Sequence, residues 1–218
     1  MKANNKQKAP SFKFQVSSIT PYTLIEILMV IVIMALLMVA AMPAFTEMMK
    51  GQGVEASARN IGQTLKLARS YAINNRENVA VLIPKENLPS NYNFRGYRVC
   101  LVNSDNSFKR WLPGENWEFM STGVAVVDID NDPNYDAGAY ASATPPITAV
   151  NCSGVGASYS SVDLTGLVFK PTGKSSTPAY IVIGEAVESG GSLQRTNTSG
   201  DVNIVINEFT GRVTFGEE

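Results

Sequence analysis

An uncharged apolar run near the N-terminus constrains this chain of 218 residues more than any other feature. The 18 residues from Ile27 to Ala44 carry no charge, and about 20 apolar helical residues span the ~30 Å hydrocarbon core of a bilayer. The helix of a soluble core would show a polar face, which this run lacks. A cleaved secretory signal has a shorter apolar part, although Val39-Ala40-Ala41 offers the small residues of a cleavage site. The run predicts a membrane-spanning helix.

The charges around the run predict its orientation. Residues 1–21 contain four lysines and no acid, so the rest of the chain has 14 of the 18 basic residues against all 19 acidic ones, a net charge of −5. Because basic residues favour the cytoplasmic side of a membrane span, we expect a single-pass protein with a cytoplasmic N-terminus and an exported C-terminal part.

The composition argues against an enzyme. The chain has no histidine, which removes the commonest general base and metal ligand. Its two cysteines, Cys100 and Cys152, are too few for a four-ligand zinc site and allow at most one disulfide. No nucleophile with a base, phosphate loop or metal cluster is apparent, so we expect no enzymatic activity and no cofactor.

An acid lies at the start of the apolar region. A carboxylate in lipid costs about 2.5–3.5 kcal/mol at mid-membrane, so Glu26 must stay near the headgroups or be paired. The basic leader, the segment Tyr22-Thr23-Leu24-Ile25-Glu26 and the apolar run together resemble the class III signal of type IV pilins and type II secretion pseudopilins. The resemblance implies that a prepilin peptidase cuts between Pro21 and Tyr22 and methylates the new N-terminus.

The same resemblance implies roles for two further residues. Glu26 would pair with the N-terminal amine of a neighbouring subunit in a filament. Pro43 occupies the place of a helix-bending proline. Pro21 departs from the family, which has glycine before the cut, and proline restricts the backbone at the scissile bond.

Downstream of the apolar run, the pattern predicts a second helical half and then strands. Apolar residues recur every three or four positions, at Val54, Ala58, Ile61, Leu65, Ala68 and Ala72. We expect one helix from Tyr22 to about Arg76, loosened at Gly51 and Gly53. Short β-branched segments predict strands at 79–84, 96–102, 123–129, 164–170, 180–187, 202–206 and 212–215, the last two forming a hairpin.

These elements predict an α+β fold in which one long helix packs on antiparallel sheets. We expect a basic leader at 1–21, a membrane-spanning half of the helix at 22–48, an amphipathic half at 49–76 and an exported β-rich domain at 77–218. This pilin-like arrangement agrees with the resemblance.

Three downstream segments narrow the resemblance to the GspH/FimT-like minor pseudopilins. They are residues 67–76 (LARSYAINNR), 168–173 (VFKPTG) and 211–213 (GRV). The resemblance implies a subunit of the bacterial inner membrane with its C-terminal domain in the periplasm, which helps to initiate or cap a pseudopilus or type IV pilus. Its partners would be other pilins through the N-terminal helix, prepilin peptidase and the inner-membrane assembly platform.

A DNA-uptake or adhesive minor pilin is the alternative function. Some FimT-like proteins are thought to use basic residues near a terminal Gly-Arg motif, but here Arg212 is followed by Val213-Thr214 and the exported part is acidic. Nucleic acid is therefore not expected as a partner, and a membrane-anchored enzyme or binding protein is the third alternative.

Three smaller features each allow two interpretations. Asp128, Asp130 and Asp132 alternate as in a calcium loop, but Pro133 replaces the required glycine, so a solvated acidic turn is the main interpretation. Cys100 and Cys152 form a disulfide or remain a buried and an unpaired thiol. Trp111 and Trp117 flank a Pro-Gly turn as core aromatics or as a ligand platform.

Overall fold

The structure, a computed structural model, describes residues 22–130, 146–190, 192–197 and 200–216. The chain divides into two compact units, residues 1–44 and 45–218. Helix α1, Leu24–Asn75, begins in the first unit and continues into the second, which we call the head. Asp132 and the leader 1–21, with Pro21, lie outside the described residues.

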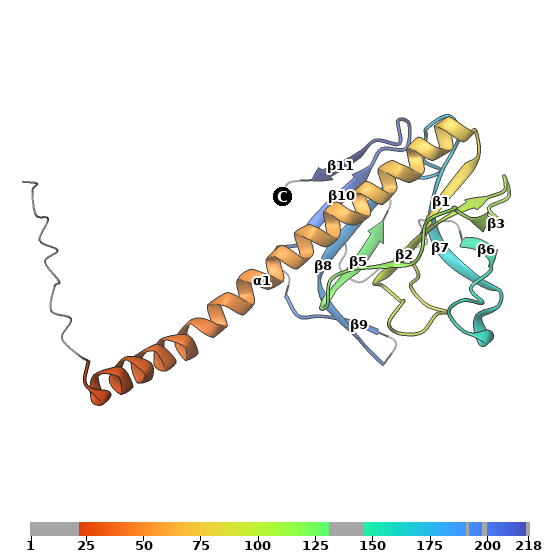
Figure 1. The fold of residues 1–218 in the computed structure, drawn as a ribbon. Helices are drawn as coiled ribbons and strands as arrows, with labels where there is room; N and C mark the ends of the chain where they lie inside the picture. The colour runs from red at the N-terminus through yellow and green to blue at the C-terminus, as the bar shows by residue number, and fades with distance from the viewer. Residues whose placement is uncertain (1–21, 131–145, 191, 198–199, 217–218) are drawn as a thin grey trace, which may run out of the picture. The chain divides into compact units, whose positions relative to one another are not determined.

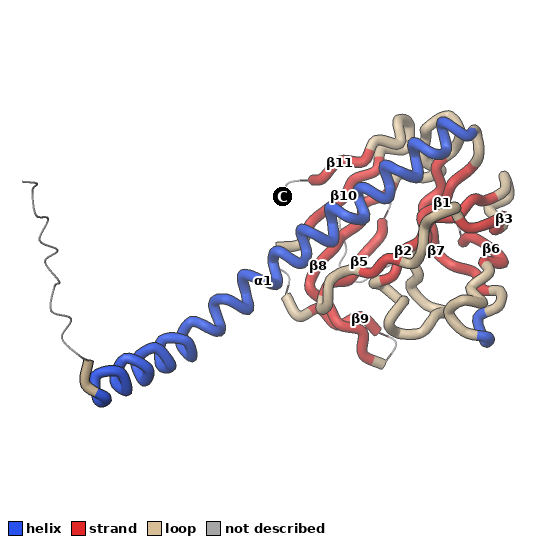
Figure 2. Tube along the Cα trace, viewed as in Figure 1, coloured by secondary structure: helices blue, strands red, loops and turns tan. Residues whose placement is uncertain are grey.

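Two antiparallel sheets build the head (Figures 1 and 2). The six-stranded sheet has the order β3-β2-β1-β7-β6, with β4 paired to β2, and the five-stranded sheet has the order β11-β10-β8-β5, with β9 paired to β8. The strands are β1 Asn78–Leu82, β2 Gly96–Val102, β3 Phe108–Trp111, β4 Glu118–Phe119, β5 Val124–Asp130, β6 Pro146–Val150, β7 Val162–Phe169, β8 Ala179–Ser189, β9 Ser192–Arg195, β10 Val202–Ile206 and β11 Val213–Gly216. The α+β fold is confirmed.

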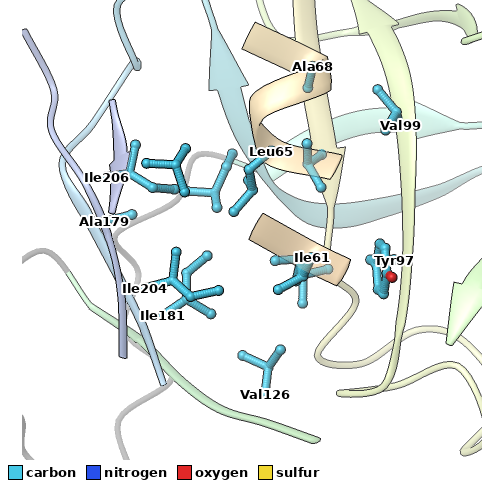
Figure 3. Packing of buried hydrophobic residues seen from close by; sticks show 14 of the residues in the cluster. Ile61, Leu65, Ala68, Tyr97, Val99, Val126, Ala179, Ile181, Ile204 and Ile206 are labelled. Atoms are coloured by element: carbon cyan, nitrogen blue, oxygen red, sulfur yellow. The ribbon is translucent and has the colours of Figure 1, made fainter. Parts of the chain in front are cut away.

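The apolar stripe of α1 fills the main core of the head. All six predicted stripe residues are at most 2% exposed. Figure 3 shows Ile61, Leu65 and Ala68 between the two sheets, with isoleucines of β8 and β10 on one side and Tyr97 and Val99 of β2 on the other. Since each fully buried aliphatic side chain contributes about 1.5–3 kcal/mol, the helix is an integral part of the head.

Each sheet also buries part of its outer face. Ala80, Cys100, Ile147, Cys152 and Leu164 belong to a second cluster on the six-stranded sheet. A smaller cluster, which includes Phe94, Val127 and Val182, covers part of the five-stranded sheet. β1 and β5 are thus buried on both sides, whereas β4, β9 and β11 keep exposed residues.

The seven predicted strands all form, with ends shifted by a few residues at most positions. In the predicted hairpin, Ile206 pairs with Val213 across a turn in which Gly211 adopts φ +60°. β3, β4, β6 and β9 were not predicted. β6 and β9 lie in the segments between the predicted strands. The helix continues through Gly51 and Gly53 without interruption.

Candidate assembly site

Of the two predicted assembly residues, Glu26 lies in the first turn of α1 and Tyr22 lies two residues before the helix begins. The Thr23 carbonyl oxygen accepts hydrogen bonds from the main-chain N–H groups of Glu26 and Ile27, at 3.1 and 3.3 Å. The Thr23 hydroxyl lies 3.4 Å from the Glu26 nitrogen, so Thr23 caps the helix. Glu26 is the third helical residue, where a carboxylate interacts favourably with the helix dipole. Both Tyr22 and Glu26 are exposed.

The helix that follows this turn is apolar on every side. The 20 residues Leu24–Pro43 have a mean hydropathy of 3.0 and none of them is buried, so this segment can cross a membrane by length and composition. Pro43 lies inside α1 and removes one N–H from its hydrogen-bond ladder. It comes one residue before the boundary between the two units. The bend at Pro43 stays a prediction.

Arg69 joins three segments that are far apart in the sequence. Its Nε donates to the Gly173 carbonyl oxygen at 3.1 Å and to the Thr210 carbonyl oxygen at 3.0 Å. Gly173 lies in the loop between the two sheets, after β7, and Thr210 lies in the turn between β10 and β11. We call Arg69, Gly173, Thr210 and Gly211 the Arg69 cluster. The three segments that carry the GspH/FimT resemblance therefore meet at one place.

Two glycines allow the loop after β7 and the β10–β11 turn to approach each other in the Arg69 cluster. Gly173 and Gly211 have φ values of +80° and +60°, a conformation that residues with a Cβ resist. A Cβ on Gly211 would overlap the Gly173 carbonyl oxygen and lie 3.0 Å from Arg69 Nε. Main-chain carbonyl groups bound to a guanidinium offer neither a nucleophile nor a general base. The cluster instead fixes both sheets to the C-terminal part of α1.

The two cysteines lie in the same buried cluster on the six-stranded sheet. Cys100 and Cys152 are 0% and 1% exposed, and the structure holds them as separate thiols. Trp111 is paired with Cys100 across β2 and β3, and its indole donates to the carbonyl oxygen of Asn151, next to Cys152, at 3.1 Å. Burial raises the pKa of Cys152 to about 11 and that of Cys100 still further. The disulfide between them stays a prediction.

Comparison with known proteins identifies the family. The model of the family "Type II transport protein GspH" matches residues 57–211, more than half of the chain. The chain belongs to the GspH family. This membership confirms the resemblance to the GspH/FimT-like pseudopilins, a structural rather than an enzymatic family.

Two solved structures resemble this GspH-family chain. The type IV minor pilin FimU of Pseudomonas aeruginosa is 16% identical, with 79% of this chain and 92% of that chain covered and a TM-score of 0.46. The minor pseudopilin EpsH from the type II secretion system of Vibrio cholerae is 16% identical, with 77% and 97% covered and a TM-score of 0.44. No curated protein matches the chain.

The weak calcium candidate of this GspH-family member is only partly described. Asp128 is fully buried, its Oδ1 accepts a hydrogen bond from the Ile129 N–H at 2.8 Å, and its Oδ2 has no partner. Within the described ranges, no three His, Cys, Asp or Glu side chains group as metal ligands. Burial raises the pKa of Asp128 to about 6, with Asp130 adding to this effect and Lys85 opposing it.

The buried Asp128 predicts a pH effect on the stability of the head. An aspartate has a pKa of about 3.9 in an unfolded chain, so between about pH 4 and pH 6 the folded state holds a proton that the unfolded state has lost. Unfolding free energy therefore falls as pH rises through this window. We expect Asp128→Asn to reduce this decrease of the unfolding free energy with pH, and to raise the unfolding free energy by about 1–2 kcal/mol at pH 7. Urea unfolding of both forms at pH 4.5 and 7 checks this, and equal pH dependence would contradict it.

The tryptophans of the head are half-buried, and they pack against the cluster on the six-stranded sheet. Trp111 and Trp117 have ring centroids 5.9 Å apart, and Tyr92 contacts Trp117 edge-on at 5.4 Å. The Arg98 guanidinium lies 3.9 Å from the centroid of a Trp111 ring. These contacts favour the interpretation as core aromatics.

Proposed function

We propose that this chain is a minor pseudopilin that inserts in the bacterial inner membrane through residues 22–48 and takes part in initiating or capping a filament. The first turn of α1 carries this proposal. It places one carboxylate, that of Glu26, in the first turn of an exposed apolar helix that has the length of a membrane span. Its orientation, with the head in the periplasm, follows from the lysines of the leader.

The proposed mechanism is electrostatic pairing in an apolar surrounding. Cleavage between Pro21 and Tyr22 by a prepilin peptidase would create an ammonium group four residues before Glu26 on every subunit. A charge in lipid is tolerated chiefly when it is paired, so the ammonium of one subunit and the Glu26 carboxylate of its neighbour stabilise each other. The ion pair then fixes the axial offset between neighbouring helices as the assembly platform extracts subunits from the membrane.

Substitution of Glu26 tests the proposal. Removing one partner of a buried ion pair costs about 3–5 kcal/mol, so we expect Glu26→Ala and Glu26→Gln to leave the protein in the membrane fraction while its amount in sheared filaments falls at least about a hundredfold. Glu55→Ala is the matched control, because Glu55 is an exposed acid on the same helix, outside the apolar segment. Normal filament incorporation of Glu26→Ala would refute the proposed pairing.

A further inference from the structure

Within the head, helix α1 has an acidic groove along one flank. The groove has a volume of about 520 Å³ and lies between α1 and the strands β2 and β4. Gln63 and Leu67 of α1 line it, together with Glu115, Glu118 and Phe119. Leu67 is 43% and Phe119 45% exposed, so two apolar surfaces stand beside two carboxylates. We call this surface the acidic groove.

The carboxylates of the acidic groove are held in place by the fold. Tyr97, 2% exposed, lines the groove, and burial together with a hydrogen bond to Glu118 raises the pKa of Tyr97. Its hydroxyl therefore stays protonated and donates to the Glu118 carboxylate. Arg98 donates to the main-chain carbonyl oxygen of Glu115 at 3.1 Å, which fixes the loop that carries this residue. Preorganised acceptors of this kind suit a cationic side chain.

The opposite flank of α1 carries cations and aromatic rings. Phe215 of β11 packs on Gly62, where an added Cβ would lie 2.7 Å from the ring, and Lys66 lies 5.4 Å from the centroid of this ring. Lys174 lies 5.9 Å from the centroid of Phe209, which is 72% exposed. Arg212 is exposed beside the same turn. We call Lys66, Lys174, Arg212, Phe209 and Phe215 the basic flank.

Among the described residues, the charges of both surfaces have no partners in ion pairs. Over the described residues, the ion pairs join Arg59 to Glu55, Lys109 and Arg110 to Glu77, and Arg195 to Asp201. None of them includes a charge of the acidic groove or of the basic flank. Each surface thus combines exposed apolar area with an excess of charges of one sign, with Glu208 as the one acid in the turn that carries Phe209 and Arg212. This is the composition of a protein interface rather than of an ordinary solvated face.

We propose that the basic flank of one copy of this chain docks in the acidic groove of a second copy. The proposal rests on the proposed function, because anchoring in one membrane gives the two copies the same orientation. A two-fold pairing of identical surfaces would place carboxylates against carboxylates, whereas groove-to-flank contact pairs opposite charges. Such a head-to-tail contact leaves one groove and one flank free, so that a further subunit can be added.

Site-specific cross-linking tests the contact. The full chain, with benzoylphenylalanine in place of Leu67, is expressed in the membrane of a bacterium that lacks other pilins. We expect a cross-linked dimer of the chain on illumination, and none with the photoreactive group at Val187, which is 49% exposed and belongs to neither surface. Lack of a dimer from Leu67 in protein that is present in the membrane would overturn the proposal.

Charge reversal tests the complementarity. Glu115→Lys with Glu118→Lys, or Lys66→Glu with Lys174→Glu, should each lower the dimer yield about tenfold. Co-expression of the two reversed chains should restore it as a mixed dimer. Glu86→Lys is the matched control, since Glu86 is an exposed acid that belongs to neither surface, so we expect its dimer yield to stay normal.

Other occupants of these surfaces would give different results. A cross-link formed only with another pilin, in a host that makes one, would overturn docking of a second copy. Docking of a second copy would also be overturned if the chain shifted DNA in a gel through its basic flank, in a salt-dependent manner, while reversal of the groove charges left the dimer yield unchanged.

Glu26→Ala separates the proposed contact between heads from the proposed pairing of Glu26. If the charge-dependent dimer persists while incorporation into filaments is unaffected by Glu26→Ala, the proposed pairing fails and the contact between heads stands.

Discussion

Gly211→Ala is expected to lower the unfolding free energy of the head by about 4 kcal/mol or more. A positive φ at a residue with a Cβ costs about 1–3 kcal/mol, and at Gly211 the added Cβ also overlaps the Gly173 carbonyl oxygen. The loops must separate, and Arg69 then loses one or both of its carbonyl acceptors. In thermal unfolding of the full chain in detergent, the midpoint should fall by roughly 10 °C.

Gly114→Ala is the matched control for this prediction. Gly114 has φ +86°, but a Cβ there meets nothing within 4 Å. The control therefore carries the conformational cost without the overlap, and we expect a loss of only about 1 kcal/mol. Equal effects of the two substitutions would mean that the backbone conformation, rather than the contact with Gly173, determines the cost.

Cys100 and Cys152 are expected to form a disulfide in the exported protein. Two thiols would be oxidised by a protein disulfide of the thiol oxidase class, which is reduced to two thiols in the exchange. The bond would close a loop of 52 residues and stabilise the head by about 4 kcal/mol in the chain-entropy model. We expect the purified protein to lack free thiols and to lose about 10 °C in melting midpoint on reduction.

The timing of oxidation gives this second prediction a further test. The thiolate is the attacking species, and burial in the folded head raises the pKa of both thiols. Protein that folds reduced should therefore react slowly with oxidised glutathione, whereas unfolded protein should react readily. The variant with both cysteines changed to alanine serves as control, because its melting midpoint should not respond to reductant. Two free thiols in protein isolated from its natural compartment would contradict the prediction.

The elements that could be predicted from sequence are those in which burial imposes a regular period. The stripe of α1 repeats at helical spacing because one face meets the core, and the β10–β11 hairpin has a glycine where its turn needs a positive φ. β6 and β9 lack such a signal. Only Ile147 and Val150 are buried in β6, and β9 alternates between exposed and half-buried residues. Their pairing with β7 and β8 decides their conformation, and pairing partners are not visible in a linear pattern.

The candidate site was predictable only where it is local. The first turn of α1 is a contiguous motif, so Glu26 could be singled out by its apolar surroundings and by the resemblance to pilin signals, whereas the capping by Thr23 was seen only in the structure. The Arg69 cluster joins residues more than a hundred positions apart, and the sequence showed its three segments only as separate similarities. The acidic groove combines the outward face of a helix with a loop after β3 and a two-residue strand. No periodicity connects these parts.

The way α1 enters the core has a consequence for biogenesis. Residues 54–72 are synthesised before every strand of the head, yet their apolar side chains are covered only when strands from both sheets have been made, including β11. Until β11 has been made, a nascent subunit therefore presents an amphipathic helix without cover. A fragment that starts after Ala72 lacks the whole apolar stripe and should fail to fold.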